Sequence, residues 1–338
     1  MKPADPTAEP RKALIDGFGR RISYVRLSVT DRCDLRCRYC MSEKMKFLPR
    51  SELLTIEELA YLSELLIARG VRRIRLTGGE PLVRRGVLDL VGLIGDRVGK
   101  GLDEVTMTTN ATQLAGVADA LFAAGMRRIN VSLDSLDAER FRTITRRGEL
   151  SKVLAGIEAA KAAGLAVKIN MVALKGLNDD EFVEMLVWCG RQGFDLTLIE
   201  TMPLGEIEED RTDRYLPLHA VKAALDDKFT LVPTVHRTGG PARYFEVIES
   251  GARLGLITPL TNNFCAGCNR VRITATGTIY GCLGHDQNIE LRDLMRNGDP
   301  DAVNAALDRL IAGKPERHLF DIARTEPAVA RHMSVTGG

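Results

Sequence analysis

The segment Ile22–Cys40 reads ISYVRLSVTDRCDLRCRYC and places a buried strand, Ile22–Val29, directly before three cysteines. Cys33, Cys37 and Cys40 have the spacing C-x3-C-x2-C. Three thiolates on one short loop suit a four-iron cluster in which one iron lacks a protein ligand. Structural zinc is the competing interpretation, but zinc prefers four ligands from paired C-x2–4-C units, and no fourth Cys or His lies near in the sequence. We therefore expect a cluster with an open position, as catalytic metal sites have.

The strand Ile22–Val29 opens an alternation of strands and helices that continues to Glu200. Further strands are expected at Arg73–Thr77, Glu104–Thr109, Arg128–Ser132, Ala166–Val172 and Asp195–Glu200. Helices are expected at Thr55–Ala68, Val87–Val98, Gln113–Ala124, Ser151–Gly164 and Asp179–Gly193. Thr55 and Glu58 resemble a capping box at the start of the first of these helices.

Six strand–helix units with short connections predict a parallel sheet with crossover helices. They are too few for a complete eight-fold barrel. A partial barrel and an open doubly wound sheet both fit the pattern. Either architecture gathers its chemistry beyond the C-terminal ends of the strands, where the first cysteine loop falls.

Beyond Leu204 the pattern changes to shorter, mixed elements, which predict a second domain of the α+β class. Helices are expected there at Leu216–Asp227, Ile289–Arg296 and Ala302–Ile311. Strands are expected there at Phe229–Pro233, Tyr244–Ile248, Leu254–Pro259, Val271–Thr274 and Thr278–Gly281. The sequence thus predicts a flexible tail at 1–13, a barrel domain at 14–204 and a C-terminal domain at 205–338.

Composition excludes several classes of protein. The 338 residues are 45% hydrophobic and 27% charged, which excludes a disordered or collagen-like chain. A net charge of +2 argues against bulk electrostatic binding to nucleic acid or to a membrane surface. No apolar run approaches the roughly 18 residues of a membrane helix, and Met1–Lys12 does not resemble a secretory signal. We predict a cytoplasmic protein, in which seven cysteines favour metal or catalytic use over disulfides.

A second group of three cysteines lies late in the chain, at Cys265, Cys268 and Cys282. Its spacing is C-x2-C-x13-C, and a zinc site that includes His285 is the alternative to a second cluster. Arg270 and Arg272 follow the first two of these cysteines on an expected strand, so their side chains share one face. Two guanidinium groups beside an open iron suit a phosphorylated ligand.

The C-x3-C-x2-C motif, with Tyr39 before its last cysteine, resembles the radical S-adenosylmethionine (SAM) superfamily. Gly78–Pro81 reads GGEP directly after the second strand and resembles the glycine motif by which that superfamily binds SAM. Glycine is compatible with that role because backbone approaches a ligand closely only where no Cβ intervenes. The resemblance implies a partial barrel of six strand–helix units, of the TIM type, and SAM bound at the open iron.

Together with the second cysteine trio, the sequence resembles the GTP-cyclising family of molybdenum cofactor biosynthesis over Leu14–Gly338. Arg26–Cys33 is similar to the lead-in to that family's first motif, and Ile199–Pro203 to the end of its sixth strand. The closing Gly337 and Gly338 match the family's double-glycine tail, which reaches into the active site. The resemblance implies that the C-terminal α+β domain covers the barrel opening.

The resemblance also implies roles for individual residues. The cluster ligands would be Cys33, Cys37, Cys40, Cys265, Cys268 and Cys282. The SAM contacts would be Tyr39, Gly79, Ser132 and Met202. The GTP contacts would be Arg26, Arg75, Thr108, Lys168, Arg270, Val271 and Arg272. The catalytic residues would be Gly337, Gly338, Arg270 and Arg272.

The sequence departs from the family pattern at two positions. Thr197 stands where the family often has an arginine, so one triphosphate contact is missing or replaced. Ala111 stands where the family's TTNG segment has glycine, which we expect to change the loop slightly and the chemistry not at all.

The activity implied by the resemblance is that of a lyase that converts GTP to (8S)-3′,8-cyclo-7,8-dihydroguanosine 5′-triphosphate, the first step of molybdenum cofactor biosynthesis. The implied cofactors are two [4Fe-4S] clusters and SAM. The implied partners are GTP, an electron donor of the flavodoxin or ferredoxin type and, by pathway, a downstream cyclic pyranopterin monophosphate synthase. A homodimer is left open, and neither nucleic acid nor a membrane is expected as a partner.

Three other functions fit parts of the sequence. A radical SAM enzyme with an auxiliary cluster that modifies a peptide is the nearest alternative, and the Arg270–Arg272 pair and the Gly-Gly tail argue against it. A zinc-stabilised binding protein and a simple iron–sulfur electron carrier are alternatives from other classes. Iron and sulfide analysis separates these, because two four-iron clusters correspond to about eight irons per chain.

Overall fold

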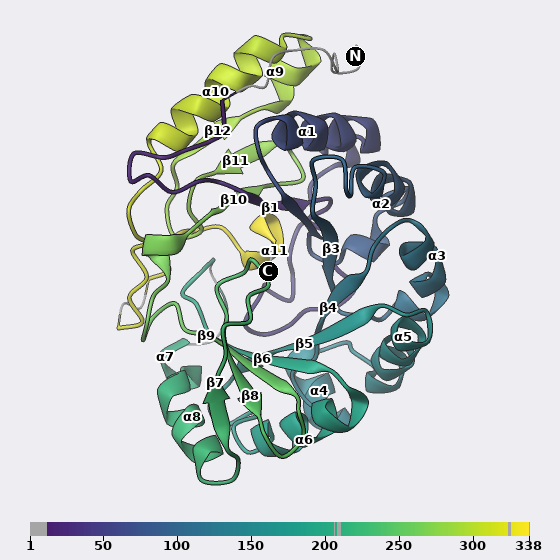
Figure 1. Cartoon of the computed structure of the whole chain (residues 1–338), viewed down its shortest axis with the longest axis vertical. Helices are drawn as coiled ribbons and strands as arrows, with labels where there is room; N and C mark the ends of the chain where they lie inside the picture. Colours follow the sequence, from purple (N-terminus) through teal and green to yellow (C-terminus); the bar gives the residue numbers. More distant parts are fainter. Residues whose placement is uncertain (1–11, 206, 208–210, 324–325, 338) are drawn as a thin grey trace.

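The computed structural model of the chain describes residues 12–205, 207, 211–323 and 326–337. One curved sheet runs through the described part of the molecule, and helices cover its outer face (Figure 1). Residues 1–11 of the expected tail lie outside the described residues.

Six parallel strands form the centre of the sheet, and each pairs with the next in chain order. They are β1 (Tyr24–Ser28), β2 (Arg73–Thr77), β3 (Glu104–Thr109), β4 (Arg128–Ser132), β5 (Ala166–Ala173) and β6 (Asp195–Glu200). All six were predicted, five of them with ends within one residue. Both faces of these strands are covered, so their residues do not alternate between buried and exposed. Most residues of each strand are buried.

The two faces of these strands nevertheless differ in chemistry. In β2, Ile74 and Leu76 join the hydrophobic core, whereas Arg75 and Thr77 line cavities inside the curve of the sheet. Successive side chains of a strand point to opposite faces. The helices therefore pack on the apolar face, and the polar face is left to line the interior of the barrel.

Strands from the C-terminal segment extend both edges. β10 (Arg270–Ile273) pairs in parallel with β1, and β9 (Arg253–Ile257) pairs in parallel with β6. Antiparallel strands follow outward, namely β11 (Thr278–Tyr280) and β12 (Asn288–Glu290) on one edge, and β8 (Arg243–Val247) and β7 (Leu231–Pro233) on the other.

Within the described residues the order is β12-β11-β10-β1-β2-β3-β4-β5-β6-β9-β8-β7, an open sheet of twelve strands. The predicted partial barrel is confirmed, and the doubly wound alternative is not. Since the segment after Leu204 adds strands to both edges of one sheet, the division into domains at 204/205 stays a prediction.

Helices α1 to α6 cover the outer face of the barrel (Figure 1). Their bounds are α1 Ile56–Ala68, α2 Val87–Gly95, α3 Ala118–Ala123, α4 Ala138–Thr145, α5 Leu150–Ala162 and α6 Phe182–Gln192. The capping box is confirmed: Thr55 Oγ1 accepts from Glu58 N at 3.2 Å, and Glu58 Oε2 accepts from Thr55 N at 2.8 Å.

The C-terminal segment contributes the remaining helices of the described residues. They are α7 Arg211–Arg214, α8 Leu218–Asp226, α9 Arg292–Arg296, α10 Pro300–Ala312 and α11 Met333–Thr336. Single 3₁₀ turns lie at Arg50–Glu52, Pro81–Val83, Leu114–Gly116 and Cys265–Gly267. No helix in the described part of the chain is long and apolar enough to span a membrane.

Three helix predictions were wrong in detail. The helix expected at Gln113–Ala124 is a 3₁₀ turn followed by α3, because Val117 leaves helical geometry at φ −135° and ψ 0°. Glu149, not Ser151, precedes α5. The helix expected at Ile289–Arg296 is β12 followed by α9, because Ile289 pairs with β11.

The helix α4 was missed altogether. It spans only eight residues, and its one sequence signal is the cap Asp137, whose side chain accepts from Arg140 N at 2.7 Å.

Gly95 and Gly92 provide a matched test of how α2 packs against the turn at Ala124. A Cβ on Gly95 would lie 2.0 Å from Ala124 O, whereas a Cβ on Gly92 would meet nothing within 4 Å. We expect Gly95→Ala to cost about 1–3 kcal/mol of unfolding free energy, and Gly92→Ala to be neutral or to add up to about 1 kcal/mol. Urea unfolding of the full chain, followed by circular dichroism, measures both. Equal effects of the two changes would contradict the packing of α2 against the Ala124 turn.

Candidate active site

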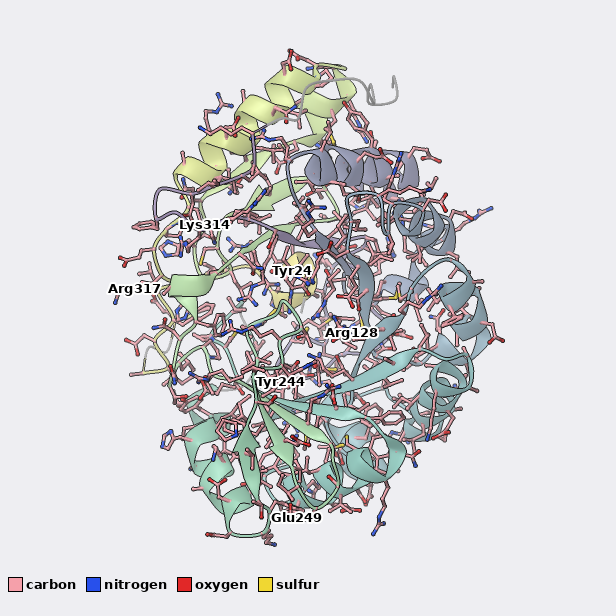
Figure 2. The ribbon with its side chains drawn as sticks, viewed as in Figure 1. Tyr24, Arg128, Tyr244, Glu249, Lys314 and Arg317 are labelled. Atoms are coloured by element: carbon pink, nitrogen blue, oxygen red, sulfur yellow. The ribbon has the colours of Figure 1, made fainter. Side chains whose placement is uncertain are left out.

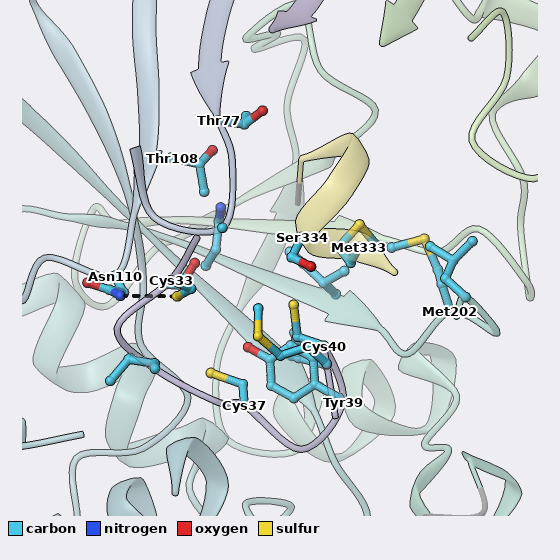
Figure 3. Close-up of a pocket in the computed structure, with 18 of the residues that line it drawn as sticks. Cys33, Cys37, Tyr39, Cys40, Thr77, Thr108, Asn110, Met202, Met333 and Ser334 are labelled. Carbon is cyan, nitrogen blue, oxygen red and sulfur yellow. Dashed lines mark hydrogen bonds between the residues drawn. The ribbon is translucent and has the colours of Figure 1, made fainter. Parts of the chain in front are cut away.

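The first cysteine trio lies on the loop that follows β1, at the C-terminal ends of the parallel strands (Figure 3). The end of α4 holds this loop, because the amides of Arg36 and Arg38 donate to the carbonyls of Thr145 and Ile144, each at 3.0 Å. The buried guanidinium of Arg36 also donates to Cys33 O at 2.7 Å. The helix that the sequence analysis missed therefore fixes the backbone that carries the three thiols.

The three thiols line one cavity and are free cysteines. Burial raises the pKa of Cys33, Cys37 and Cys40, that of Cys40 to about 12, so without a metal they keep their protons. A metal cluster supplies the positive charge that thiolates require in such a dry place. Among the described residues no three His, Cys, Asp or Glu side chains meet closely enough to hold one metal ion. A four-iron cluster does not need such a meeting, because each thiolate binds a different iron, and the donor set fits it.

The GGEP segment packs directly on the cysteine loop. Gly79 N donates to Thr30 O at 2.9 Å, and Glu80 N donates to Arg32 O at 2.8 Å. A Cβ on Gly78 would lie 2.6 Å from Thr30 O, and a Cβ on Gly79 would lie 2.3 Å from Arg32 O. Glycine is required at both positions by contact with the chain itself, a different reason from the close ligand approach that the sequence suggested.

Glu80 ties this segment to the end of β3. Its carboxylate accepts from Leu82 N at 3.0 Å, Thr109 Oγ1 at 2.7 Å and Asn110 N at 2.7 Å. Asn110 Nδ2 in turn lies 3.8 Å from Cys33 Sγ (Figure 3). Asn110 was not singled out from the sequence, although it stands in the TTNA segment that was.

The residues expected to contact SAM line the same cavity as the first cysteine trio: Tyr39, Gly79, Ser132 and Met202. The ring of Tyr39 is fixed by its hydroxyl, which donates to Asp134 Oδ2 at 2.7 Å, and Asp134 Oδ1 accepts from Val172 N at 2.9 Å. Burial raises the pKa of Asp134 to about 6. Its place just beyond β4 was the available sequence signal, and the sequence analysis missed it.

A second cavity holds most of the residues expected to contact GTP. Arg26, Arg75, Lys168, Arg270, Val271 and Arg272 line it. The second cysteine trio lines it too. Burial alone would raise the pKa of Cys268, but Arg270 and Lys314 bring it down to about 7. Thr108, expected among the GTP contacts, lines the first cavity instead, with its buried hydroxyl unpaired.

The two cavities meet. Asn170, Ile199, Met202 and Met333 line both of them. Met202 and Met333 lie side by side above the first cysteine loop in Figure 3. The two cysteine trios, distant in sequence, therefore face adjoining parts of one chamber. Asn170 and Met333 were not found from the sequence, because nothing local distinguishes them.

Strand register explains the row of cations in the second cavity. Arg26 pairs with Arg272 of β10 on one side and with Arg75 of β2 on the other. Registered neighbours of parallel strands project to the same face. Three guanidinium groups on three adjacent strands thus point into the chamber, and Lys168 on β5 adds an ammonium group that donates to Tyr244 Oη at 3.1 Å.

Arg75 and Lys168 are buried, Arg26 and Arg272 are half-buried, and none of the four shares an ion pair with a carboxylate in the described residues. Burial lowers the pKa of Arg26 to about 9, with a further contribution from Arg75, and lowers that of Lys168 and Arg272 well below their usual values. Only 4% of Arg75 is exposed. Burying so much charge of one sign is costly without a counter-charge. The second cavity is therefore suited to a polyanion.

The C-terminal segment enters the chamber along α11 (Figure 1). Gly337 O accepts from Arg26 Nη1 at 3.4 Å and from Arg272 Nη1, which also donates to Thr336 O at 3.2 Å. Gly337 has φ +77°, and a Cβ on it would lie 2.0 Å from Thr77 Oγ1, so only glycine fits. Gly338 lies outside the described residues.

Ala111 and Thr197, the two residues that depart from the family pattern, lie in different structural environments. Ala111 keeps a left-handed φ of 61°, which costs a residue with a side chain about 1–2 kcal/mol. Thr197 is fully buried on β6 between Asn170 and Gly255, and its hydroxyl has no hydrogen-bond partner.

Comparisons with known proteins agree with this geometry. A family model described as the Radical SAM superfamily matches residues 27–189, and one described as Molybdenum Cofactor Synthesis C matches residues 194–320. A GTP 3′,8-cyclase of Erythrobacter litoralis is 61% identical over 327 residues, 96% of this chain and 98% of that protein. A GTP 3′,8-cyclase of Agrobacterium fabrum is 56% identical over 342 residues, 100% of this chain and 98% of that protein.

Among solved structures, Streptococcus suis SuiB bound to S-adenosylmethionine is similar to this chain with a TM-score of 0.62 at 15% identity. The match covers 88% of this chain and 66% of SuiB. At that identity the likeness concerns the fold, and it supports the partial barrel.

The open parallel barrel, with three thiols on the loop after β1 and GGEP after β2, defines a radical SAM enzyme. Within that class, the chain belongs to the GTP 3′,8-cyclase family. Enzymes of this family use SAM and two [4Fe-4S] clusters.

Glu80 gives the site a predicted pH dependence. Burial raises the pKa of Glu80 from 4.5 to about 7, against the three hydrogen bonds that it accepts. The native state therefore binds the proton more tightly than the unfolded state, so this contribution to stability is full below pH 4.5 and is lost as pH rises to 7. Through this group the wild-type chain should lose on the order of 3 kcal/mol of unfolding free energy between pH 4.5 and pH 7, and Glu80→Gln should not show that loss.

Urea unfolding of the metal-free full chain at several pH values measures this slope. Glu158→Gln, an exposed glutamate on α5, is the matched control and should leave the slope unchanged. An identical pH slope in wild type and Glu80→Gln would show that Glu80 is ionised in the folded protein as it is in the unfolded one.

Proposed function

We propose that this chain converts GTP to (8S)-3′,8-cyclo-7,8-dihydroguanosine 5′-triphosphate, the first step of molybdenum cofactor biosynthesis. The observation that carries the proposal is the single chamber between two cysteine trios, lined on one side by buried and half-buried cations without carboxylate partners in the described residues. The name GTP 3′,8-cyclase, carried by relatives 55–61% identical over nearly the whole chain, supports it.

In this proposal the six cysteines hold two [4Fe-4S] clusters, three to a cluster. When bound, the clusters and SAM would supply reductive radical chemistry that transfers the 3′ hydrogen of GTP to the 5′-deoxyadenosyl group of SAM, releases methionine and allows C3′ to bond to guanine C8. One further electron and one proton complete the product, which is an isomer of GTP.

In this proposal the side chains of the protein bind SAM and GTP, orient them and neutralise the charge of the triphosphate. Tyr39, Gly79, Ser132 and Met202 would hold SAM beside the first cluster. The GTP contacts would be Arg26, Arg75, Lys168, Arg270, Val271 and Arg272, with Thr108 reaching the substrate from the first cavity. Cations already fixed at the position of the triphosphate need no rearrangement when it binds, which helps to hold the ribose at contact distance from the 5′-deoxyadenosyl group.

The C-terminal tail would complete the site. Arg26 and Arg272 both donate to Gly337 O, so the tail and the substrate phosphates share the same guanidinium groups. We propose Gly337, Gly338, Arg270 and Arg272 as the catalytic set, in which the tail keeps the arginines oriented.

We further propose partners, a cellular location and a domain boundary for this protein. An electron donor of the flavodoxin or ferredoxin type and a downstream cyclic pyranopterin monophosphate synthase follow from the proposed reaction. A reducing, cytoplasmic location is supported by seven free cysteines. A separate C-terminal domain at 205–338 is supported by the change of element pattern after Leu204.

Anaerobic incubation of the reconstituted protein with SAM, a reductant and GTP tests the proposal. Mass spectrometry should find an isomer of GTP, 5′-deoxyadenosine and methionine in equal amounts, and deuterium from C3′ of labelled GTP should appear in the 5′-deoxyadenosine. GDP, ATP and a peptide pool serve as control substrates. A peptide product in place of the GTP isomer would contradict the proposal.

Cys37→Ala is the matched inactive variant in that assay. It should abolish SAM cleavage and leave the visible absorbance of the second cluster, because the second trio is untouched. Cleavage of SAM by this variant would show that the first trio does not hold the reactive cluster.

Arg75→Met tests the polyanion site. Loss of a charge-assisted hydrogen bond, worth about 1.5–3 kcal/mol, should weaken GTP binding about ten- to a hundredfold, while SAM binding stays the same. Arg72→Met is the control, because the side chain of Arg72 is exposed and its partner within the described residues is the carbonyl of Gly101, to which it donates at 3.0 Å. Isothermal titration of both ligands measures the effect. Equal weakening of GTP and SAM binding would indicate a structural role for Arg75.

A further inference from the structure

Lys314 lies just beyond the end of α10 and reaches the second cysteine trio (Figure 2). Its ammonium donates to Cys268 Sγ at 3.7 Å and to the carbonyl of Gly281, the residue before Cys282. One side chain therefore joins two cysteine-bearing segments, one just before β10 and the other just after β11.

The position of Lys314 is fixed by the chain around it. Arg20 donates to Cys265 O at 2.9 Å and to the carbonyls of Pro315 and Glu316, both at 2.7 Å. The same guanidinium thus binds the start of the Cys265–Cys268 segment and the residues that follow Lys314. The lysine and the trio are held as one unit.

Burial makes this lysine unusual. Only 2% of Lys314 is exposed, and no carboxylate in the described ranges forms an ion pair with it. A buried ammonium without a counter-charge destabilises a fold, so such groups are normally paired. The negative charge that this position offers is that of the cysteine thiolates when they bind a cluster.

We propose that Lys314 is a positioning residue for the second iron–sulfur cluster and that its charge raises the reduction potential of that cluster. Hydrogen bonds to ligating sulfurs and nearby charge are among the factors that set cluster potentials. A fixed cation stabilises the reduced cluster more than the oxidised one, because the reduced cluster carries one more negative charge. The inference rests on the second cluster of the proposed function, and it does not depend on GTP turnover.

The test compares Lys314→Met, Lys314→Arg and Lys152→Met. Lys152 is exposed on α5 and pairs with Glu149 at 2.9 Å, so its replacement controls for loss of one lysine charge. Each full-length variant carries alanine at the first cysteine trio, so that its reconstituted EPR signal comes from the second cluster alone.

A redox titration followed by EPR gives the potential of each variant. We expect a more negative potential in Lys314→Met, a value near wild type in Lys314→Arg, and no change in Lys152→Met. Iron loss to a chelator should be faster in Lys314→Met, since loss of such a contact typically costs about ten- to a hundredfold in metal affinity. An unchanged potential in Lys314→Met overturns the proposal, even if iron is lost faster.

A second measurement covers the case in which Lys314→Met does not fold or load iron. The full-length chain with alanine at the first cysteine trio, otherwise wild type, is labelled with 15N-lysine, and its reduced second cluster is examined by pulsed EPR. A weak 15N coupling is expected in wild type and in Lys168→Arg, and its loss is expected in Lys314→Arg. No coupling in wild type overturns the proposal. Failure to turn over GTP would instead contradict the proposed function and would leave both of these readouts intact.

Discussion

The backbone hydrogen bonds between β1 and β10 hold together two parts of the chain that lie near its opposite ends. Their parallel register sets Arg26 beside Arg272 and Tyr24 beside Arg270. The first cysteine trio follows β1; Cys265 and Cys268 of the second trio precede β10, and Cys282 follows β11, the strand paired with β10. This one strand pairing therefore brings both trios and the central arginines to a single chamber, and a shift in register by one residue would turn the arginines to the other face of the sheet.

Unbalanced positive charge is the second constraint on the site. Arg26, Arg75, Lys168 and Arg272 are packed inside the barrel without carboxylate partners in the described ranges, although the whole chain is nearly neutral. Such an arrangement is unfavourable for the empty protein and favourable once a polyanion enters. Lys314 repeats the arrangement at the second trio, where we propose that the thiolates of a bound cluster supply the counter-charge. The unpaired charge therefore destabilises the empty protein, and the same charge, already in position, strengthens the binding of a polyanion.

Local signals were sufficient for much of the fold. The six barrel strands were predicted because β-branched and apolar runs alternate with helices at short spacing, and α1 was predicted from its capping box. The missed helix and one of the wrong helix predictions also have identifiable causes. α4 is short and charged, and the helix expected over Ile289 became β12 because pairing with Ile279 outweighed helical spacing. Pairing with another strand leaves no trace in the residue spacing of a single segment.

The sequence by itself determined the chemistry: two cysteine trios, a GGEP turn, a set of basic residues at strand positions and a terminal Gly-Gly. These are properties of residue type and spacing, which the chain carries whether folded or not. Only the tertiary structure decided which of them meet. It placed Thr108 in the first cavity, brought Asp134, Asn170 and Met333 to the chamber, and set Lys314 against Cys268. The physical reason is that such contacts depend on strand register and on close packing between segments far apart in sequence, and neither is encoded in any one segment.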